Sequence, residues 1–241
     1  MLPIQDLNPR RRFPFVTFSL IIINALVFIW TLLKPADELQ SIFMQLSVVP
    51  FNITENPVAL ETPLDIFRSM FFHGGWLHLL SNMLYLYLFG DNVEDRMGAF
   101  LYIFLYFFSG IVAVFSQILI DPYSRIPLIG ASGAIAGILG SYLLLFPGVR
   151  VRGIIPLGPY IRFAEWPAWT VLVMWFVLQL MSGFLALGAE TGEGGGVAFF
   201  AHIGGFVAGL FFTFIFMRTF RQPPANERRR VLYERAKRYR Y

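Results

Sequence analysis

The chain has 241 residues, of which 56% are hydrophobic and 14% are charged, and its mean hydropathy is +0.62. A soluble domain carries about 25% charged residues. The composition therefore excludes a disordered chain, a nucleic-acid-binding tail protein and an ordinary cytosolic enzyme. The sequence contains no cysteine, which excludes disulfides, thiolate metal sites and a cysteine nucleophile. Lipid is the expected solvent for most of the chain.

Six apolar segments are candidates for membrane-spanning helices, because a span needs roughly 20 mostly apolar residues. In chain order they are Phe13–Leu33, Leu77–Gly90, Ala99–Ile120, Ser132–Phe146, Trp166–Leu187 and Phe199–Met217. The first is too long for a signal-peptide core and no cleavage site follows it, so we expect it to be retained. The second and fourth are short, and such segments usually pack inside a bundle. The sequence thus predicts an all-α polytopic membrane protein whose residues 13–217 form a six-helix membrane domain.

The placement of basic residues predicts the orientation of these helices. Arginines precede the first span and occupy the connection between the fourth and fifth spans. Residues 218–241 contain nine basic residues against two acidic ones, a net charge of +7. Basic segments stay on the cytoplasmic side, so we expect both termini there. Residues 1–12 are then a cytoplasmic N-terminal segment, and residues 218–241 are a basic tail attracted to anionic lipid and not to nucleic acid.

The six-span plan and the lack of a transit sequence favour a multi-pass protein of the prokaryotic cytoplasmic membrane. In that topology the long connection Lys34–Met70 lies outside. The glycine-rich connection Ala189–Gly196, just before the last span, also lies outside and is expected to be mobile.

Uncharged polar side chains at membrane depth are costly and usually functional. His78 and Asn82 are four residues apart in the second segment, so they share one helix face. Ser132 begins the fourth segment, and His202 lies about one turn into the sixth. The predicted topology places all four at a similar depth near the outer face. A serine hydroxyl needs an adjacent base to act as a nucleophile, and the histidine of the sixth segment can supply it.

An oxyanion intermediate needs preorganised hydrogen-bond donors. The backbone N–H groups at the start of the fourth helix and the side chains of Asn82 and His78 can provide them. No acidic residue lies in an outer half-span, so a Ser–His dyad fits better than a triad. Small residues follow both the serine and the catalytic histidine, including Gly205-x-x-x-Gly209. They predict a close approach of the fourth and sixth helices.

Three motifs together resemble those of the rhomboid intramembrane serine proteases, in the family's order, over roughly Phe13 to Met217. They are His73-Gly-Gly-Trp-Leu-His78-Leu-Leu-Ser-Asn82, Gly130-Ala131-Ser132-Gly133 and Ala201-His202-Ile203-Gly204-Gly205 with Gly209. The resemblance implies a six-helix bundle that cleaves single-pass transmembrane proteins near their outer membrane boundary, without a cofactor or a metal. It also implies a gate made by the fifth helix and its cap loop, here Trp166–Gly196. The implied site comprises the nucleophile Ser132, the general base His202, and the oxyanion-hole residues His78, Asn82 and Gly130 with the Ser132 backbone N–H. His73 and Ala131 are candidate accessory residues, and His73 could equally be a structural residue at the interface.

The chain departs from the family pattern at Ala136, where many members carry an aromatic residue beneath the histidine ring. We expect a phenylalanine from another helix to steady His202 instead. Two other interpretations stay open. The histidines could ligate haem in a membrane electron carrier, or the chain could be a non-catalytic relative that binds membrane proteins. The retained Ser132 and His202 argue against the second, since a binding protein needs neither.

Overall fold

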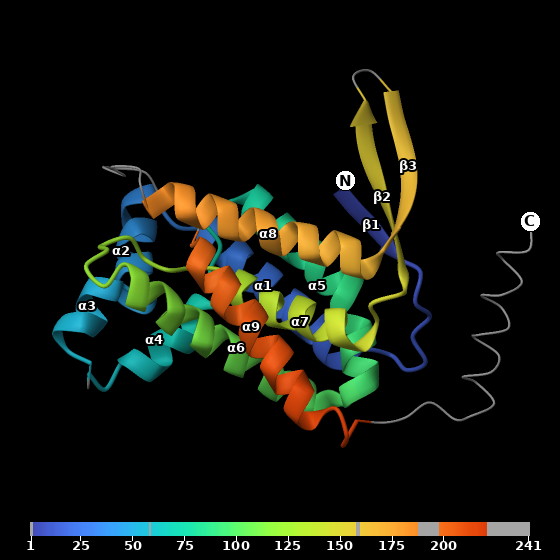
Figure 1. The fold of residues 1–241 in the computed structure, drawn as a ribbon. Helices are drawn as coiled ribbons and strands as arrows, with labels where there is room; N and C mark the ends of the chain where they lie inside the picture. Colours follow the sequence, from blue (N-terminus) through green and yellow to red (C-terminus); the bar gives the residue numbers. More distant parts are fainter. Residues whose placement is uncertain (1, 58, 158–159, 188–197, 221–241) are drawn as a thin grey trace, which may run out of the picture.

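A computed structural model describes residues 2–57, 59–157, 160–187 and 198–220 of the chain (Figure 1). The connection Ala189–Gly196 and residues 221–241 of the basic tail lie outside the described residues. The elements are, in chain order, β1 (Leu2–Asp6), α1 (Phe15–Leu32), α2 (Ala36–Leu46), α3 (Pro50–Glu55), α4 (Thr62–Ser69), α5 (Trp76–Met97), α6 (Ala99–Ile120), α7 (Ser132–Leu145), β2 (Arg150–Leu157), β3 (Tyr160–Pro167), α8 (Ala168–Leu187) and α9 (Phe199–Phe216).

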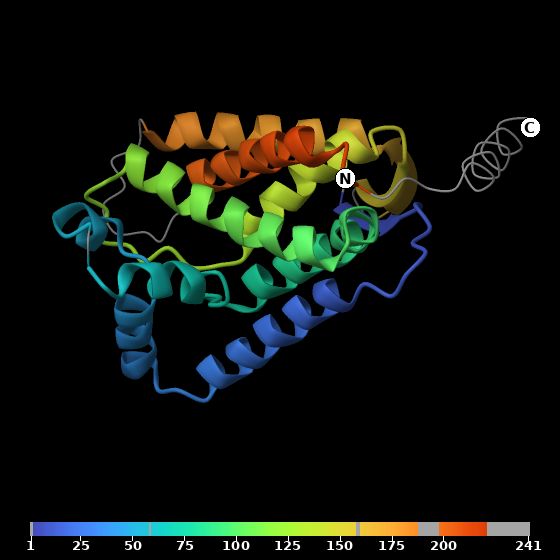
Figure 2. The ribbon, with the colours of Figure 1, turned by 90° about the horizontal axis from the view of Figure 1, so that it is seen from below.

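The six apolar segments expected from the sequence correspond to α1, α5, α6, α7, α8 and α9, which pack into a bundle (Figures 1 and 2). Among the described residues, α1, α6, α8 and α9 are long and apolar enough to cross a membrane. Helix α7 has only 14 residues, and residues 133–142 of it are all buried. It packs against α5, α6, α8 and α9. Helix α7 is therefore enclosed by the other helices, and its first residue, Ser132, is half-buried.

Glycines let α7 and α9 pack with their backbones in contact. A methyl group added to Gly205 would overlap the carbonyl oxygen of Gly133, and one added to Gly209 would overlap the carbonyl oxygen of Gly137. Small residues permit such close helix crossings in membranes. The predicted close approach of the fourth and sixth segments is confirmed.

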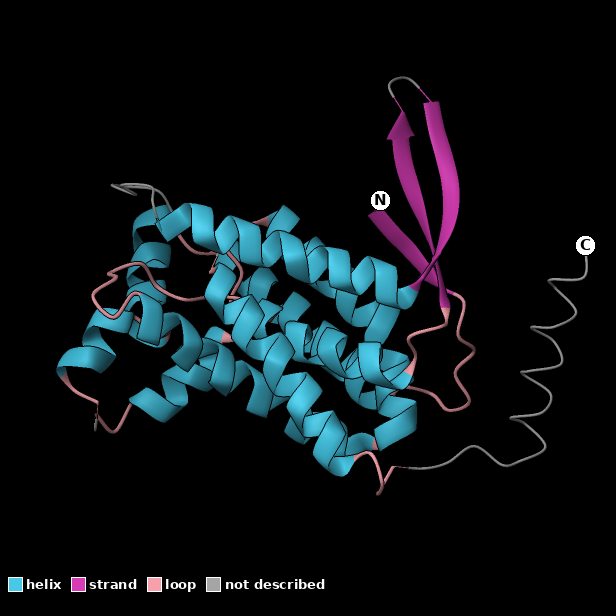
Figure 3. Ribbon diagram, viewed as in Figure 1, coloured by secondary structure: helices cyan, strands magenta, loops and turns pink. Residues whose placement is uncertain are grey.

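The all-α prediction is wrong at one end of the bundle, where three strands form an antiparallel sheet in the order β1-β2-β3 (Figure 3). Arg150 and Arg152 alternate with Val151, which is a strand pattern. Arginines in a connection are also typical of a cytoplasmic loop. The same residues therefore fit a loop as well as a strand, and the sequence pattern does not distinguish the two. Helix α8 begins at Ala168, two residues later than expected, because Trp166 pairs with Val151 in the sheet.

The sheet and the connection between α1 and α5 lie at opposite ends of the bundle (Figure 2). Pairing of β1 with β2 joins residues 2–6 to residues 150–157. The N-terminal segment and the connection between α7 and α8 therefore lie at the same end of the bundle, as expected if both are on one side of the membrane. The connection folds into α2, α3 and α4. Beside them, the Leu128 N–H donates to the Val48 carbonyl oxygen at 2.7 Å. This contact places the segment before α7, and hence the start of α7, at the end away from the sheet.

The buried carboxylate of Glu94, near the end of α5, caps the first turn of α1. It accepts the backbone N–H groups of Val16 at 2.9 Å and Thr17 at 2.8 Å, and the Thr17 hydroxyl at 2.7 Å. The first N–H groups of a helix have no partner within the helix, and the helix dipole favours an anion there. Glu94 thus holds the start of α1 against the helix that carries His78 and Asn82.

Candidate active site

Ser132 is the first residue of α7, and the turn before it requires a glycine. Gly130 has a φ of +122°, a conformation that residues with a side chain rarely adopt. Its N–H donates to the Ser69 carbonyl oxygen at 2.8 Å. A Cβ atom at this position would lie 2.6 Å from His78 Nε2. The loop can therefore place Ser132 beside His78 only if the residue at position 130 is a glycine.

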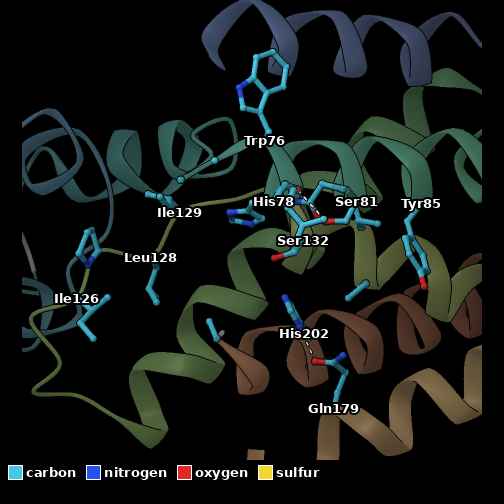
Figure 4. A pocket seen from close by; sticks show the side chains of 18 of the residues that line it. Trp76, His78, Ser81, Tyr85, Ile126, Leu128, Ile129, Ser132, Gln179 and His202 are labelled. Atoms are coloured by element: carbon cyan, nitrogen blue, oxygen red, sulfur yellow. Dashed lines mark hydrogen bonds between the residues drawn. The ribbon is translucent and has the colours of Figure 1, made fainter. Parts of the chain in front are cut away.

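A cavity of about 960 Å³ lies between α5, α7, α8 and α9. Figure 4 shows it running from Ile126 and Leu128 at one end to Tyr85 at the other, with Ser132 and His202 between them. Four of the predicted site residues line this cavity, namely Ser132, His202, His78 and Asn82. Side chains from α5, α7 and α9 thus line the same cavity.

Ser132 and His202 face each other across the cavity. In Figure 4 the His202 ring points from α9 toward Ser132. Among the described residues, the Ser132 hydroxyl has no hydrogen-bond partner, and the His202 ring bonds only to α8. Hydrogen bonds between a nucleophile and its base are often long in the free enzyme and shorten when substrate binds. The arrangement is therefore compatible with proton transfer between the two side chains.

The side chains that orient His202 come from α8. Its Nδ1 is bonded to Oε1 of Gln179 at 2.8 Å, and the Trp175 ring lies against it with a centroid distance of 6.0 Å. The expectation of a phenylalanine is wrong: among the described residues, the aromatic ring that lies against His202 is a tryptophan, and a glutamine bonds to its Nδ1. Gln179 is the one amide in α8, whose only side-chain hydroxyls are those of Thr170 and Ser182, and that polarity is the signal that could have identified it.

The amide of Asn82 is a donor without an acceptor. Its side chain is 7% exposed, and within the described part of the chain nothing accepts a hydrogen bond from Nδ2. A buried donor left unpaired costs about 1–3 kcal/mol, so such a group needs a specific explanation, such as an ordered water, a ligand or a catalytic role. Asn82 lines the cavity that contains Ser132, and it is placed to donate to an atom that enters there.

The remaining predicted residues lie around the cavity. His73 is buried, and its ring meets the His78 ring edge-on at 4.9 Å. Its Nδ1 contacts the Phe71 carbonyl oxygen at 3.3 Å. Ala131 is fully buried and precedes the first turn of α7. Gly130 lines a small adjoining pocket on the other side of Ser132. His73 thus supports His78, whereas Ala131 and Gly130 shape the turn.

Comparison with known proteins agrees with the fold and the motifs. The family model of the rhomboid domain matches residues 61–219. The chain is 31% identical to RHOMBOID-like protein 5 of Arabidopsis thaliana over 152 residues, 63% of this chain and 43% of that protein. It is 29% identical over 135 residues to the putative rhomboid protease YdcA of Bacillus subtilis, 56% of this chain and 64% of that protein.

The rhomboid protease GluP of Bacillus subtilis is 26% identical over 166 residues, 68% of this chain and 28% of that protein. The chain spans less than two thirds of the length of each of these relatives. The family match covers more than half of the chain and includes every residue that lines the cavity except Phe43. The chain is a multi-pass membrane protein and belongs to the rhomboid family.

Proposed function

We propose that this protein is an intramembrane serine endopeptidase that cleaves transmembrane proteins by a Ser132–His202 dyad. The observation that carries the proposal is the shared cavity, in which a serine, a histidine and an unpartnered Asn82 amide converge from three helices. Two relatives are named as proteases or putative proteases, which supports the same class of reaction.

The first half of the reaction forms an acyl-enzyme. His202 accepts the Ser132 hydroxyl proton on Nε2 while Oγ bonds to the carbonyl carbon of the substrate peptide. The carbonyl oxygen becomes an oxyanion that accepts hydrogen bonds from Asn82 Nδ2, His78 and the Ser132 backbone N–H. That N–H has no partner in the helix because it belongs to the first turn of α7. His202 then donates its proton to the leaving nitrogen, the C–N bond breaks and the amine departs.

The second half restores the enzyme. Water attacks the acyl carbon while His202 accepts its proton, and the proton returns to Ser132 as the C–O bond breaks. Because the start of α7 lies at the end of the bundle away from the sheet, water reaches the site from that end. A peptide carbonyl in a regular helix is already hydrogen-bonded and shielded. The substrate helix therefore has to unwind, and glycine or proline near the cleaved bond favours cleavage.

We also propose the topology that places this site. Residues 13–217 form six spans, with α5 and α7 packed among the four longer helices. Both termini and the sheet are cytoplasmic, and the site faces the outer side of a prokaryotic cytoplasmic membrane. Arginines adjoin β1 and occupy both strands of the β2–β3 hairpin, which supports this orientation. Residues 218–241 are then a cytoplasmic basic tail.

Cleavage in liposomes tests the proposal. Wild-type protein is reconstituted with a single-pass substrate that carries glycine in its outer half, and the product is identified by mass spectrometry. We expect cleavage by the wild type and none by Ser132→Ala. The matched control is Ser141→Ala, since Ser141 is a buried serine of the same helix that bonds only to backbone carbonyls of Gly137 and Gly209. Equal cleavage by wild type and Ser132→Ala would refute the proposal.

A further inference from the structure

Helix α8 is the least buried of the four long apolar helices. Only 17% of its apolar window is buried, against 33–39% for the other three. It packs mainly on α9 and touches α7 less. Trp175 packs over His202 and Phe206 of α9, with ring centroids 6.0 Å away in both cases, and Phe176 stacks on Phe206 at 4.6 Å. The contacts of α8 with the core thus centre on the part of α9 that holds the catalytic histidine.

The Gln179–His202 hydrogen bond determines which ring nitrogen of His202 carries the proton. An amide oxygen only accepts hydrogen bonds, so the 2.8 Å contact of Oε1 requires a proton on Nδ1. Nε2 is then the unprotonated nitrogen, and Figure 4 shows Gln179 and Ser132 on opposite sides of the ring. A histidine can take a proton from a serine only through an unprotonated nitrogen. The bond therefore selects the tautomer in which the base faces the nucleophile.

Within the part of the chain that the structure describes, no carboxylate replaces Gln179 in this role. The His202 ring has no acidic hydrogen-bond partner there, and α8 contains no acidic residue. In serine proteases with three members, an aspartate on the far nitrogen holds the histidine in the same tautomer. An uncharged amide does this in an apolar helix without the cost of burying a charge.

We propose that Gln179 is a positioning residue, which fixes the proton of His202 on Nδ1 and so keeps Nε2 free to accept the proton of Ser132. The proposal rests on the proposed proteolytic function and adds a residue of α8 to the site. Loss of the Gln179–His202 bond frees the ring to rotate or to change tautomer.

Two readouts test this inference on the wild type and three variants, and a fourth variant serves to assign the histidine signal. Gln179→Met keeps the length of the side chain and removes the acceptor oxygen. Gln179→Glu keeps an acceptor oxygen in place. The matched control is Gln117→Met, because Gln117 Oε1 accepts the backbone N–H of Ala201 at 3.3 Å without touching the His202 ring. The readouts are cleavage kinetics in liposomes and the tautomer of ¹⁵N-labelled histidine in lipid bilayers.

We expect Gln179→Met to lower kcat by about 100-fold with KM little changed, since a misoriented catalytic group costs about that much. Gln179→Glu should retain most of the rate, and so should Gln117→Met. The chain has three histidines, so the signal of His202 can be assigned with His202→Gln. It should report the Nδ1–H tautomer in the wild type and in Gln179→Glu, and lose it in Gln179→Met.

An unchanged His202 tautomer or an unchanged kcat in Gln179→Met would overturn the inference. An equal loss of kcat in Gln117→Met would do the same, because it would show a general disturbance of α9. If the wild type cleaves no substrate, the proposed function fails, and the tautomer measurement still decides whether Gln179 positions the ring.

Discussion

Gly130 shows how a single residue without a side chain can set the geometry of the site. Its positive φ turns the chain into α7, and the space where a side chain would begin is occupied by the His78 ring. The positive φ excludes a side chain because of the backbone conformation, and the His78 ring excludes it because of the space it occupies. The backbone conformation of this glycine and the position of the His78 ring are therefore coupled.

Gly130→Ala should impair catalysis while leaving the bundle folded. The added methyl group strains the turn and displaces His78, and a misplacement of about 1 Å can cost 10²-fold in rate. We expect a fall of that size in kcat/KM, measured by cleavage in liposomes. Gly148→Ala is the control, because a Cβ atom there meets no other atom within 4 Å and its φ is not positive. Full activity of Gly130→Ala would contradict this account of the turn.

Part of the site was predictable at the residue scale because polar residues are conspicuous in apolar helices. Ser132, His202, His78 and Asn82 were predicted from that contrast, and the structure brings all four to one cavity. Gln179 carries the same signal, but none of the three motifs lies in α8, so the resemblance does not point to it. Trp175 carries no such signal, because a tryptophan in a membrane helix is as often a lipid-facing residue. Its contact with His202 depends on how α8 packs, which no local pattern specifies.

At the scale of elements, the crossing of α7 and α9 positions Ser132 relative to His202. Gly209 lies against the carbonyl oxygen of Gly137, and Gly205 lies against that of Gly133. Backbone cannot move aside as a flexible side chain can, so any added atom must push the two helices apart. The distance between Ser132 and His202 then increases with the helix separation.

Gly209→Ala should destabilise the protein and slow cleavage together. Overpacking in a close-packed interior costs about 1–3 kcal/mol, and thermal unfolding in detergent measures it. The control is Val207→Ala, since Val207 is half exposed on the outer side of the same helix and such changes cost no more than about 0.5 kcal/mol. If Gly209→Ala matched the control in both stability and rate, the backbone contact would not be what positions the dyad.

The helices were more predictable than the sheet. Runs of apolar residues about 20 long have few alternatives in a membrane, and all six predicted segments are helices. The strands β2 and β3 are short and carry arginines, so the same residues also fit a basic cytoplasmic connection. Pairing of β1 with β2 joins positions nearly 150 residues apart. Such contacts depend on the folded bundle, and a local pattern does not reveal them.

At the scale of the whole molecule, a half-buried acid joins strand β1 to helix α5. Asp6 accepts the side-chain amide of Asn92 in α5 at 2.7 Å and the backbone N–H of Asn8 at 3.0 Å. Burial raises the pKa of Asp6 from 3.8 to about 7, and the nearby Asp91 carboxylate adds to the rise. The docked strand therefore binds a proton that the detached strand releases at neutral pH.

The attachment of β1 should weaken as the pH rises. Because the pKa of Asp6 is higher in the folded state, the docked strand holds more protons than the detached one between about pH 4 and pH 7. The stabilisation is complete below pH 4 and is lost as the pH passes through 7. Hydrogen exchange of residues 2–6, corrected for intrinsic rates, should show at least about tenfold less protection at pH 8 than at pH 5. Asp6→Asn should remove this dependence, and a wild type with equal protection at both values would contradict the assignment.

The central claim is that His202 activates Ser132 as a nucleophile in a membrane-embedded cavity. Reaction of the reconstituted protein with a fluorophosphonate, followed by mass spectrometry of the intact protein and its peptides, tests it most directly. We predict one adduct on Ser132, none in Ser132→Ala, and labelling at least about 10²-fold slower in His202→Ala, the contribution expected of a general base. A folded wild-type protein that stays unlabelled, or an adduct that persists in Ser132→Ala, would contradict the claim.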